Sequence, residues 1–104
     1  MERVTWKARI KPNQKAEYIK RHDEIWPEMT EALNEAGVHN YTIWCVGDEL
    51  FGYYEAEKGR QFAADTQAAS EVVAKWKVHM KDLMEMETDE QGRPKTLEQV
   101  FYHA

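Results

Sequence analysis

Residues 38–57 read VHNYTIWCVGDELFGYYEAE, and this stretch decides the fold. The segments Val38–Val46 and Leu50–Glu57 are rich in β-branched and aromatic residues, which is typical of strands. Between them, Gly47-Asp48 suits a tight two-residue turn that begins with glycine. The stretch therefore predicts an antiparallel hairpin.

The sequence before the hairpin predicts a strand followed by an interrupted helix. Val4–Lys11 alternates apolar and polar residues, as a half-buried strand does. Asn13 can cap a helix in which apolar residues recur at helical spacing until Gly37 ends it. Because proline cannot continue a helix normally, Pro27 should kink this helix or break it into two pieces near Asp23–Trp26.

The sequence after the hairpin predicts a second helical region and a last strand. Apolar residues mark one helical face from Gly59 to Met84. Glu85–Lys95 is polar and contains glycine and proline, so we expect a loop there, and we expect Thr96–His103 to form the fourth strand. The resulting order, β-α-β-β-α-β, is the ferredoxin-like arrangement. We therefore predict an α+β fold with a four-stranded antiparallel sheet, in one domain spanning residues 1–104.

Both faces of the predicted hairpin carry apolar or aromatic residues. Helices cover one face of such a sheet, and the other face would be polar if only solvent covered it. Apolar pairs nevertheless point to opposite faces: Ile43 against Trp44, and Phe51 with Tyr53 against Leu50 with Tyr54. We therefore expect a second subunit packed sheet to sheet, which makes a homodimer.

The composition is that of a globular protein and excludes several classes of partner. The chain has 104 residues, of which 42% are hydrophobic and 12% aromatic, with a formal net charge of −5. Lysine and arginine are interspersed with acidic residues, so we expect neither nucleic acid nor membrane as a partner. No segment is apolar for the length of a membrane span. Cys45 is the only cysteine, so no internal disulfide can form and a cytoplasmic location is expected.

His22 is the first candidate for chemistry. It lies within the apolar stripe of the first helical region, one turn after Tyr18, so the two side chains can converge on one pocket. Imidazole titrates near neutral pH and both donates and accepts protons. A histidine in this position is also compatible with a structural role at the edge of the core, hydrogen-bonded to a backbone carbonyl.

Three aromatic residues strengthen the case for a ligand pocket. Trp26, Tyr41 and Trp76 could present ring faces to the C–H face of a sugar and polar tips to its hydroxyls. Each of them alone is equally compatible with a place in the core. Asn40 could add a hydrogen-bonding amide, or it could shape the start of the second strand.

Other kinds of site lack the residues they need. The five glycines are scattered, so there is no phosphate-binding loop. The four histidines lie on different predicted elements without the spacing of metal ligands. Ser70 lacks the context of a nucleophile elbow. We therefore expect no metal, cofactor or covalent nucleophile.

Four blocks of the sequence resemble one known family. Tyr18–Glu28, YIKRHDEIWPE, resembles the Tyr-x-x-x-His-x-x-x-Trp-Pro-Glu signature of the L-rhamnose mutarotase family, and Gly37–Tyr41, GVHNY, is similar to its next block. Trp76 with Met80, and Glu98–Tyr102, are similar to its last two. The resemblance covers nearly the whole chain in matching order, which makes the set much more specific than any one block.

The resemblance implies an isomerase that interconverts the α and β anomers of L-rhamnose without a cofactor, on a dimeric α+β barrel. It implies that His22 is the proton donor, and we expect Tyr18 or a bound water to accept the second proton. Tyr18, Tyr41, Trp76 and the residue after it, Lys77, would contact the sugar. Lys77 departs from relatives that carry a second tryptophan there, and lysine does not offer the stacking surface of an indole.

Two alternatives from other classes remain open on the sequence alone. Ferredoxin-like dimers also include cofactor-free oxygenases and haem-handling proteins, because a fold does not fix a function. A non-catalytic sugar-binding module, with a structural His22, is the second. Oxygen uptake or tight haem binding would favour the former, and binding without anomer exchange the latter.

Overall fold

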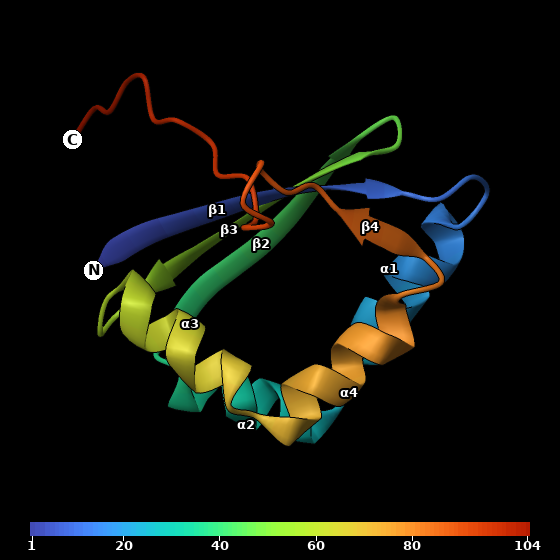
Figure 1. Cartoon of the computed structure of the whole chain (residues 1–104), viewed down its shortest axis with the longest axis horizontal. Helices are drawn as coiled ribbons and strands as arrows, with labels where there is room; N and C mark the ends of the chain where they lie inside the picture. The colour runs from blue at the N-terminus through green and yellow to red at the C-terminus, as the bar shows by residue number, and fades with distance from the viewer.

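Four strands form one antiparallel sheet in the order β2-β3-β1-β4. The computed structural model describes residues Met1–Ala104, and Figure 1 shows that the helices lie on one side of this sheet. The strands are β1 (Glu2–Ile10), β2 (Val38–Val46), β3 (Glu49–Ala56) and β4 (Met84–Met86). The helices are α1 (Lys15–Asp23), α2 (Pro27–Glu35), α3 (Arg60–Ala68) and α4 (Glu71–Met80). The predicted α+β, ferredoxin-like architecture is confirmed, each predicted helical region being a pair of short helices.

The central hairpin forms as predicted. β2 and β3 pair antiparallel, from Val46 opposite Glu49 at the turn to Val38 opposite Ala56 at the far end. Gly47 begins the two-residue turn with φ of +61°, a value that glycine adopts without steric cost.

The breaks in the two helical regions have local causes. Pro27 is the first residue of α2, where its missing N–H is not needed, so α1 ends at Asp23 as expected. In the second region the hydroxyl of Ser70 accepts a hydrogen bond from the N–H of Val73 and caps α4. The prediction of an Asn13 cap is wrong. Asn13 has φ of +63° in the preceding turn, and α1 begins without a side-chain cap.

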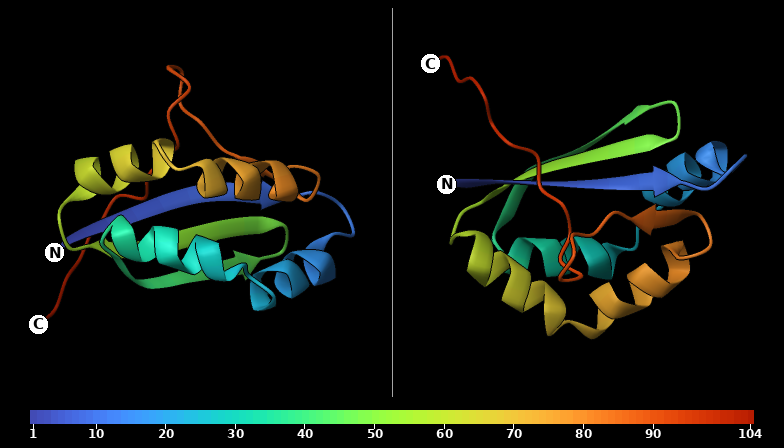
Figure 2. Two further views of the ribbon diagram at one scale, coloured as in Figure 1. Left: turned by 90° about the horizontal axis from the view of Figure 1, so that it is seen from below. Right: turned by 45° about the horizontal axis from the view of Figure 1, so that its top comes forward.

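The core lies between the helices and the inner face of the sheet. Figure 2 shows this layering from below and at an angle, with the C-terminal segment on the opposite side of the sheet. Alternation along β1 points Trp6, Ala8 and Ile10 inward, and all three are buried. The other large buried side chains come from the helices and the hairpin and include Tyr18, Met29, Leu50, Tyr54, Val73, Trp76, Met80 and Leu83.

The prediction of a fourth strand at Thr96–His103 is wrong. The fourth strand is Met84–Met86, which pairs with the end of β1 through Ile10 opposite Met84. It therefore includes Met84, the predicted end of the second helical region, and residues 85–86, the predicted start of the loop. Val100–Tyr102 has a strand-like sequence, but it pairs with no strand of the sheet, and the segment that pairs with Ala8–Ile10 of β1 is Met84–Met86. The last residues have no regular structure.

The outer face of the sheet remains partly uncovered. Trp44 and Val46 on β2 are 67% and 68% exposed. The C-terminal segment crosses only part of this face, where the N–H of Leu97 donates to Thr5 Oγ1 at 2.7 Å and the Arg3 guanidinium lies over the Tyr102 ring. None of the helices is long and apolar enough to cross a membrane.

Candidate active site

Helix α1 holds Tyr18 and His22 one turn apart, as their spacing predicted. Their ring centroids are 4.4 Å apart. His22 Nδ1 lies 3.1 Å from the backbone carbonyl oxygen of Tyr18. Because a carbonyl only accepts, Nδ1 carries the proton of the neutral ring, and Nε2 is left with a free lone pair. The hydrogen bond thus fixes both the ring orientation and the tautomer.

Burial sets the charge state of the residues on α1. Desolvation lowers the pKa of His22 below its ordinary value, against a smaller opposing effect of the hydrogen bond to Tyr18. Burial also raises the pKa of Tyr18 well above its usual range. At neutral pH the site therefore presents a neutral imidazole beside a protonated phenol.

One tryptophan packs against His22, and a second packs against the first. Trp76 on α4 meets the His22 ring edge-on, with centroids 5.5 Å apart. Trp26 meets Trp76 at 5.1 Å, also edge-on. The break before Pro27 makes this possible, because Trp26 is the extended residue that precedes α2. Trp76 is buried, whereas His22 and Trp26 are partly exposed, so an apolar wall with an accessible rim flanks the imidazole.

A bulge in β2 turns Tyr41 toward the core. His39 pairs with Glu55 and Thr42 with Tyr53, so Asn40 and Tyr41 together oppose one residue of β3. Asn40 takes φ of +49° at this point, and its side-chain amide donates to Glu55. The extra residue shifts the in–out alternation of side chains along β2 by one position, so Tyr41 points to the same inner face of the sheet as Val38. The sequence is compatible with Asn40 either as a hydrogen-bonding amide of the pocket or as a residue that shapes the start of the strand, and its place in the bulge agrees with the second role.

Asn40→Val is expected to lower the free energy of unfolding by about 1–2 kcal/mol, because a β-branched residue is strained at positive φ. Asn40→Gly should stay within about 0.5 kcal/mol of the wild type, since glycine adopts this backbone freely. Urea denaturation of the two variants measures the difference. Equal stabilities would contradict a strained bulge at this position.

Trp6 on β1 fixes the position of the Tyr41 hydroxyl by a hydrogen bond. Trp6 Nε1 donates to the Tyr41 hydroxyl oxygen at 2.8 Å, so Tyr41 keeps its own proton free to donate. Burial raises the pKa of Tyr41 to about 12. Trp6 can lie flat on β3 only because Gly52 is opposite it: a Cβ on Gly52 would be 2.0 Å from the indole. Neither the role of Trp6 nor that of Gly52 could be predicted from residue type or spacing.

Arg21 fastens α1 to the end of α4. Its guanidinium donates to Asp82 Oδ1 at 3.0 Å and to the backbone carbonyl of His79, and it also contacts Glu17 one turn earlier. The hydrogen bond lowers the pKa of Asp82 below its ordinary value. Because Arg21 adjoins His22, this set of contacts fixes the distance between His22 and Trp76.

Lys77 differs from the other predicted contacts. It is exposed and lies roughly 100° around α4 from the buried Trp76. The structure thus brings Tyr18, His22 and Trp76 together. It places Tyr41 on β2, packed against the core cluster that contains Tyr18 and Trp76. Lys77 stays a predicted contact.

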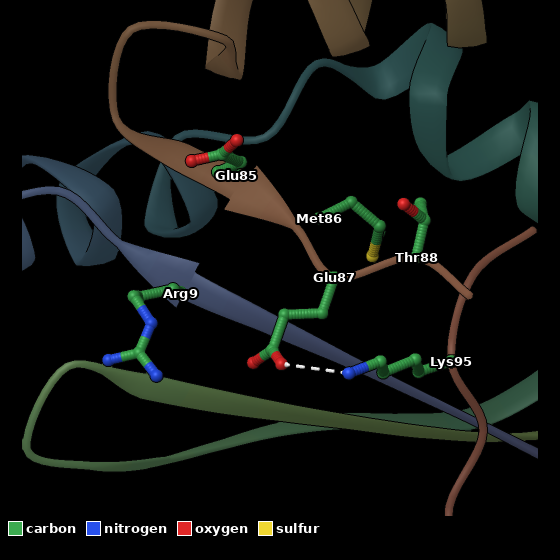
Figure 3. A pocket seen from close by; sticks show the side chains of 6 residues that line it. All are labelled: Arg9, Glu85, Met86, Glu87, Thr88 and Lys95. Atoms are coloured by element: carbon green, nitrogen blue, oxygen red, sulfur yellow. Dashed lines mark ion pairs between the residues drawn. The ribbon is translucent and has the colours of Figure 1, made fainter. Parts of the chain in front are cut away.

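The pocket drawn in Figure 3 lies elsewhere. It has a volume of about 250 Å³ at the β1–β4 edge, and Glu87 and Lys95 form an ion pair across it at 3.8 Å. Its lining is almost entirely charged or polar: Arg9, Glu85, Met86, Glu87, Thr88 and Lys95. It contains no aromatic ring and no histidine, so the aromatic cluster around His22 is the better candidate for chemistry on a sugar.

The candidate site thus combines a neutral histidine with a fixed tautomer, phenol hydroxyls and an indole wall on a ferredoxin-like α+β scaffold. Such groups are able to transfer protons and to contact a small polar ligand. The sequence profile of a family described as L-rhamnose mutarotase matches residues 3–103. The chain therefore belongs to the L-rhamnose mutarotase family, whose members are isomerase-type enzymes.

Individual relatives agree with this assignment over their whole length. The chain is 38% identical to an L-rhamnose mutarotase of Tolumonas auensis, with 100% of both chains covered. A crystal structure of an L-rhamnose mutarotase from Formosa agariphila is similar at a TM-score of 0.80 and 30% identity, again over 100% of both chains. Tetracenomycin F2 cyclase from Streptomyces glaucescens, at a TM-score of 0.67 and 16% identity over 100% of this chain and 97% of its own, shares the fold alone.

Proposed function

We propose that this protein interconverts the α and β anomers of L-rhamnose by acid–base catalysed opening and closing of the sugar ring. Membership of the family supports the reaction. The observation that carries the mechanism is the hydrogen bond from His22 Nδ1 to the Tyr18 carbonyl, which leaves Nε2 free for proton transfer. Ring opening requires no oxidation and no covalent intermediate, so the proposal includes no cofactor.

His22 is the principal proton-transfer residue in this proposal. In ring opening, neutral Nε2 takes the proton from the anomeric hydroxyl, the bond between C1 and the ring oxygen breaks, and the ring oxygen receives a proton from the Tyr18 hydroxyl or a water. The aldehyde turns about C1–C2. In closure, protonated His22 acts as the proton donor to the carbonyl oxygen, and the attacking hydroxyl returns its proton to Tyr18 or water. All protons balance over one cycle.

The remaining residues hold the sugar without gripping every hydroxyl. Tyr41 can donate a hydrogen bond because its oxygen already accepts one from Trp6. Trp76 supplies an apolar surface for C–H groups. Tyr18, Tyr41 and Trp76 are therefore the proposed sugar contacts. Lys77, exposed on α4 next to Trp76, is proposed as a further contact from the family resemblance alone. The carbon that reacts must be free to rotate while the rest of the sugar is fixed.

Activity should fall as the pH drops below the pKa of His22. The neutral form begins the reaction, and desolvation lowers this pKa below the ordinary value of about 6.5. The rate should therefore be flat at neutral pH and decrease tenfold per unit below the pKa. Exchange rates measured between pH 4 and 8, alongside an NMR titration of His22, check this. A rate that rises on acidification would contradict a neutral starting form.

The proposal includes a homodimer formed through the outer face of the sheet, in the cytoplasm. Trp44 and Val46 are mostly exposed, and Phe101 in the C-terminal segment is 79% exposed, so a second copy would remove much apolar surface from water. Sedimentation of the wild type is expected to give a dimer, and Trp44→Glu a monomer. A monomeric wild type at micromolar concentration would contradict this part of the proposal.

A further inference from the structure

His79 packs against both tryptophans of the site. Its ring centroid is 5.1 Å from that of Trp26 and 5.5 Å from that of Trp76. Only its backbone carbonyl is used, as an acceptor from Arg21. Neither ring nitrogen of His79 makes a hydrogen bond within the chain, and the half-buried ring leaves its nitrogens accessible rather than buried without a partner. The imidazole therefore offers a donor and an acceptor beside an indole wall.

The position of His79 on α4 places it on the side of the site. The buried residues Val73, Trp76 and Met80 define the inner face of this helix. At about 100° per residue, His79 and Lys77 fall on opposite edges of that face. Trp26 contacts the edge that carries His79, whereas Lys77 is exposed on the other.

Two histidines thus contact the same indole. The His22 and His79 rings each lie 5.5 Å from the Trp76 ring, which is therefore a common neighbour of both imidazoles. If this residue only packed against the two indoles, an apolar ring would serve as well as an imidazole. An imidazole with unbonded nitrogens adds what an indole wall lacks for a sugar, namely a directional partner for a hydroxyl.

We propose that His79 is a second polar sugar contact, which binds a ring hydroxyl remote from the anomeric carbon while His22 serves the reacting end. This inference rests on the proposed mutarotase activity and adds a specificity-determining residue to it. Since the contact is made equally before and during ring opening, it contributes to KM more than to kcat.

Two variants separate hydrogen bonding from packing. His79→Gln keeps an amide donor and acceptor, and His79→Phe keeps an aromatic ring without them. With L-rhamnose as the substrate, we expect His79→Phe to raise KM about 5- to 10-fold with little change in kcat, the scale of one hydrogen bond. His79→Gln should retain most of the affinity. The reverse order, with His79→Phe like the wild type and His79→Gln impaired, would assign His79 a packing role and overturn the inference.

Sugars lacking one hydroxyl identify the contact. Wild type and His79→Phe are each titrated with L-rhamnose and its 2-, 3- and 4-deoxy derivatives. For one of the three derivatives we expect the wild type to bind more weakly than it binds L-rhamnose. His79→Phe should bind that derivative and L-rhamnose equally, because in this variant the hydroxyl has no partner to lose. If, for all three derivatives, the fold loss of affinity from removing the hydroxyl is the same in His79→Phe as in the wild type, the inference is overturned. The mutarotase proposal is left intact by that result. A wild type that binds L-rhamnose without exchanging its anomers overturns the proposed function instead.

Discussion

Replacing His22 with glutamine is expected to slow enzyme-catalysed anomer exchange by about 100- to 10,000-fold, the usual contribution of a general acid–base residue. Glutamine can still hydrogen-bond to the Tyr18 carbonyl and fill part of the imidazole's space, but it neither accepts nor releases a proton near neutral pH. Optical rotation of freshly dissolved α-L-rhamnose, followed with and without protein, measures the rate.

The matched control for this variant is His39→Gln. His39 is also half-exposed, and it is also hydrogen-bonded, to Glu57 directly after β3. It lies outside the aromatic cluster. It should keep the wild-type rate. Circular dichroism would show that both variants are folded. If His22→Gln exchanges anomers as fast as His39→Gln, then His22 is a structural histidine at the edge of the core.

Gly52→Ala is expected to lower the free energy of unfolding by about 1–3 kcal/mol, the cost of overpacking a well-filled core. This corresponds to a fall in Tm of about 10 °C for a domain of this size. The added methyl would be 2.0 Å from the Trp6 indole, which is 9% exposed and has little room to move. Displacing Trp6 also removes its hydrogen bond to Tyr41, so KM for the sugar should rise.

A double-mutant cycle isolates this contact. Trp6→Leu removes the indole, so adding Gly52→Ala to it should cost much less than adding Gly52→Ala to the wild type. Thermal unfolding of the four proteins gives the coupling. Additive losses, or an unchanged Tm in Gly52→Ala, would show that Trp6 does not lie on Gly52.

The sequence predicts elements well where the signal is local. The hairpin, the turn at Gly47 and the break at Pro27 follow from residue type and spacing, and all are confirmed. The errors arise where a choice depends on distant partners. Val100–Tyr102 looks like a strand, yet the segment that pairs with the end of β1 is Met84–Met86, which has little strand character of its own.

The same distinction applies to the site. The convergence of Tyr18 and His22 follows from their spacing on one helix. The contact of Trp26 with Trp76 joins two segments far apart in the chain and could not be derived from periodicity. The positions of Trp6 and His79 were equally hidden, because each acts through a ring contact across the fold. A lone histidine on a helix edge gives no sequence signal of the two indoles beside it.

The most direct test of the central claim is saturation-transfer NMR on L-rhamnose at anomeric equilibrium. One anomeric proton is irradiated, and the signal of the other anomer is observed with and without the protein. Irradiating the α signal is expected to deplete the β signal when the wild-type protein is present, and not with His22→Gln. No transfer of saturation with a folded wild type that binds the sugar would contradict catalysis and identify a binding module.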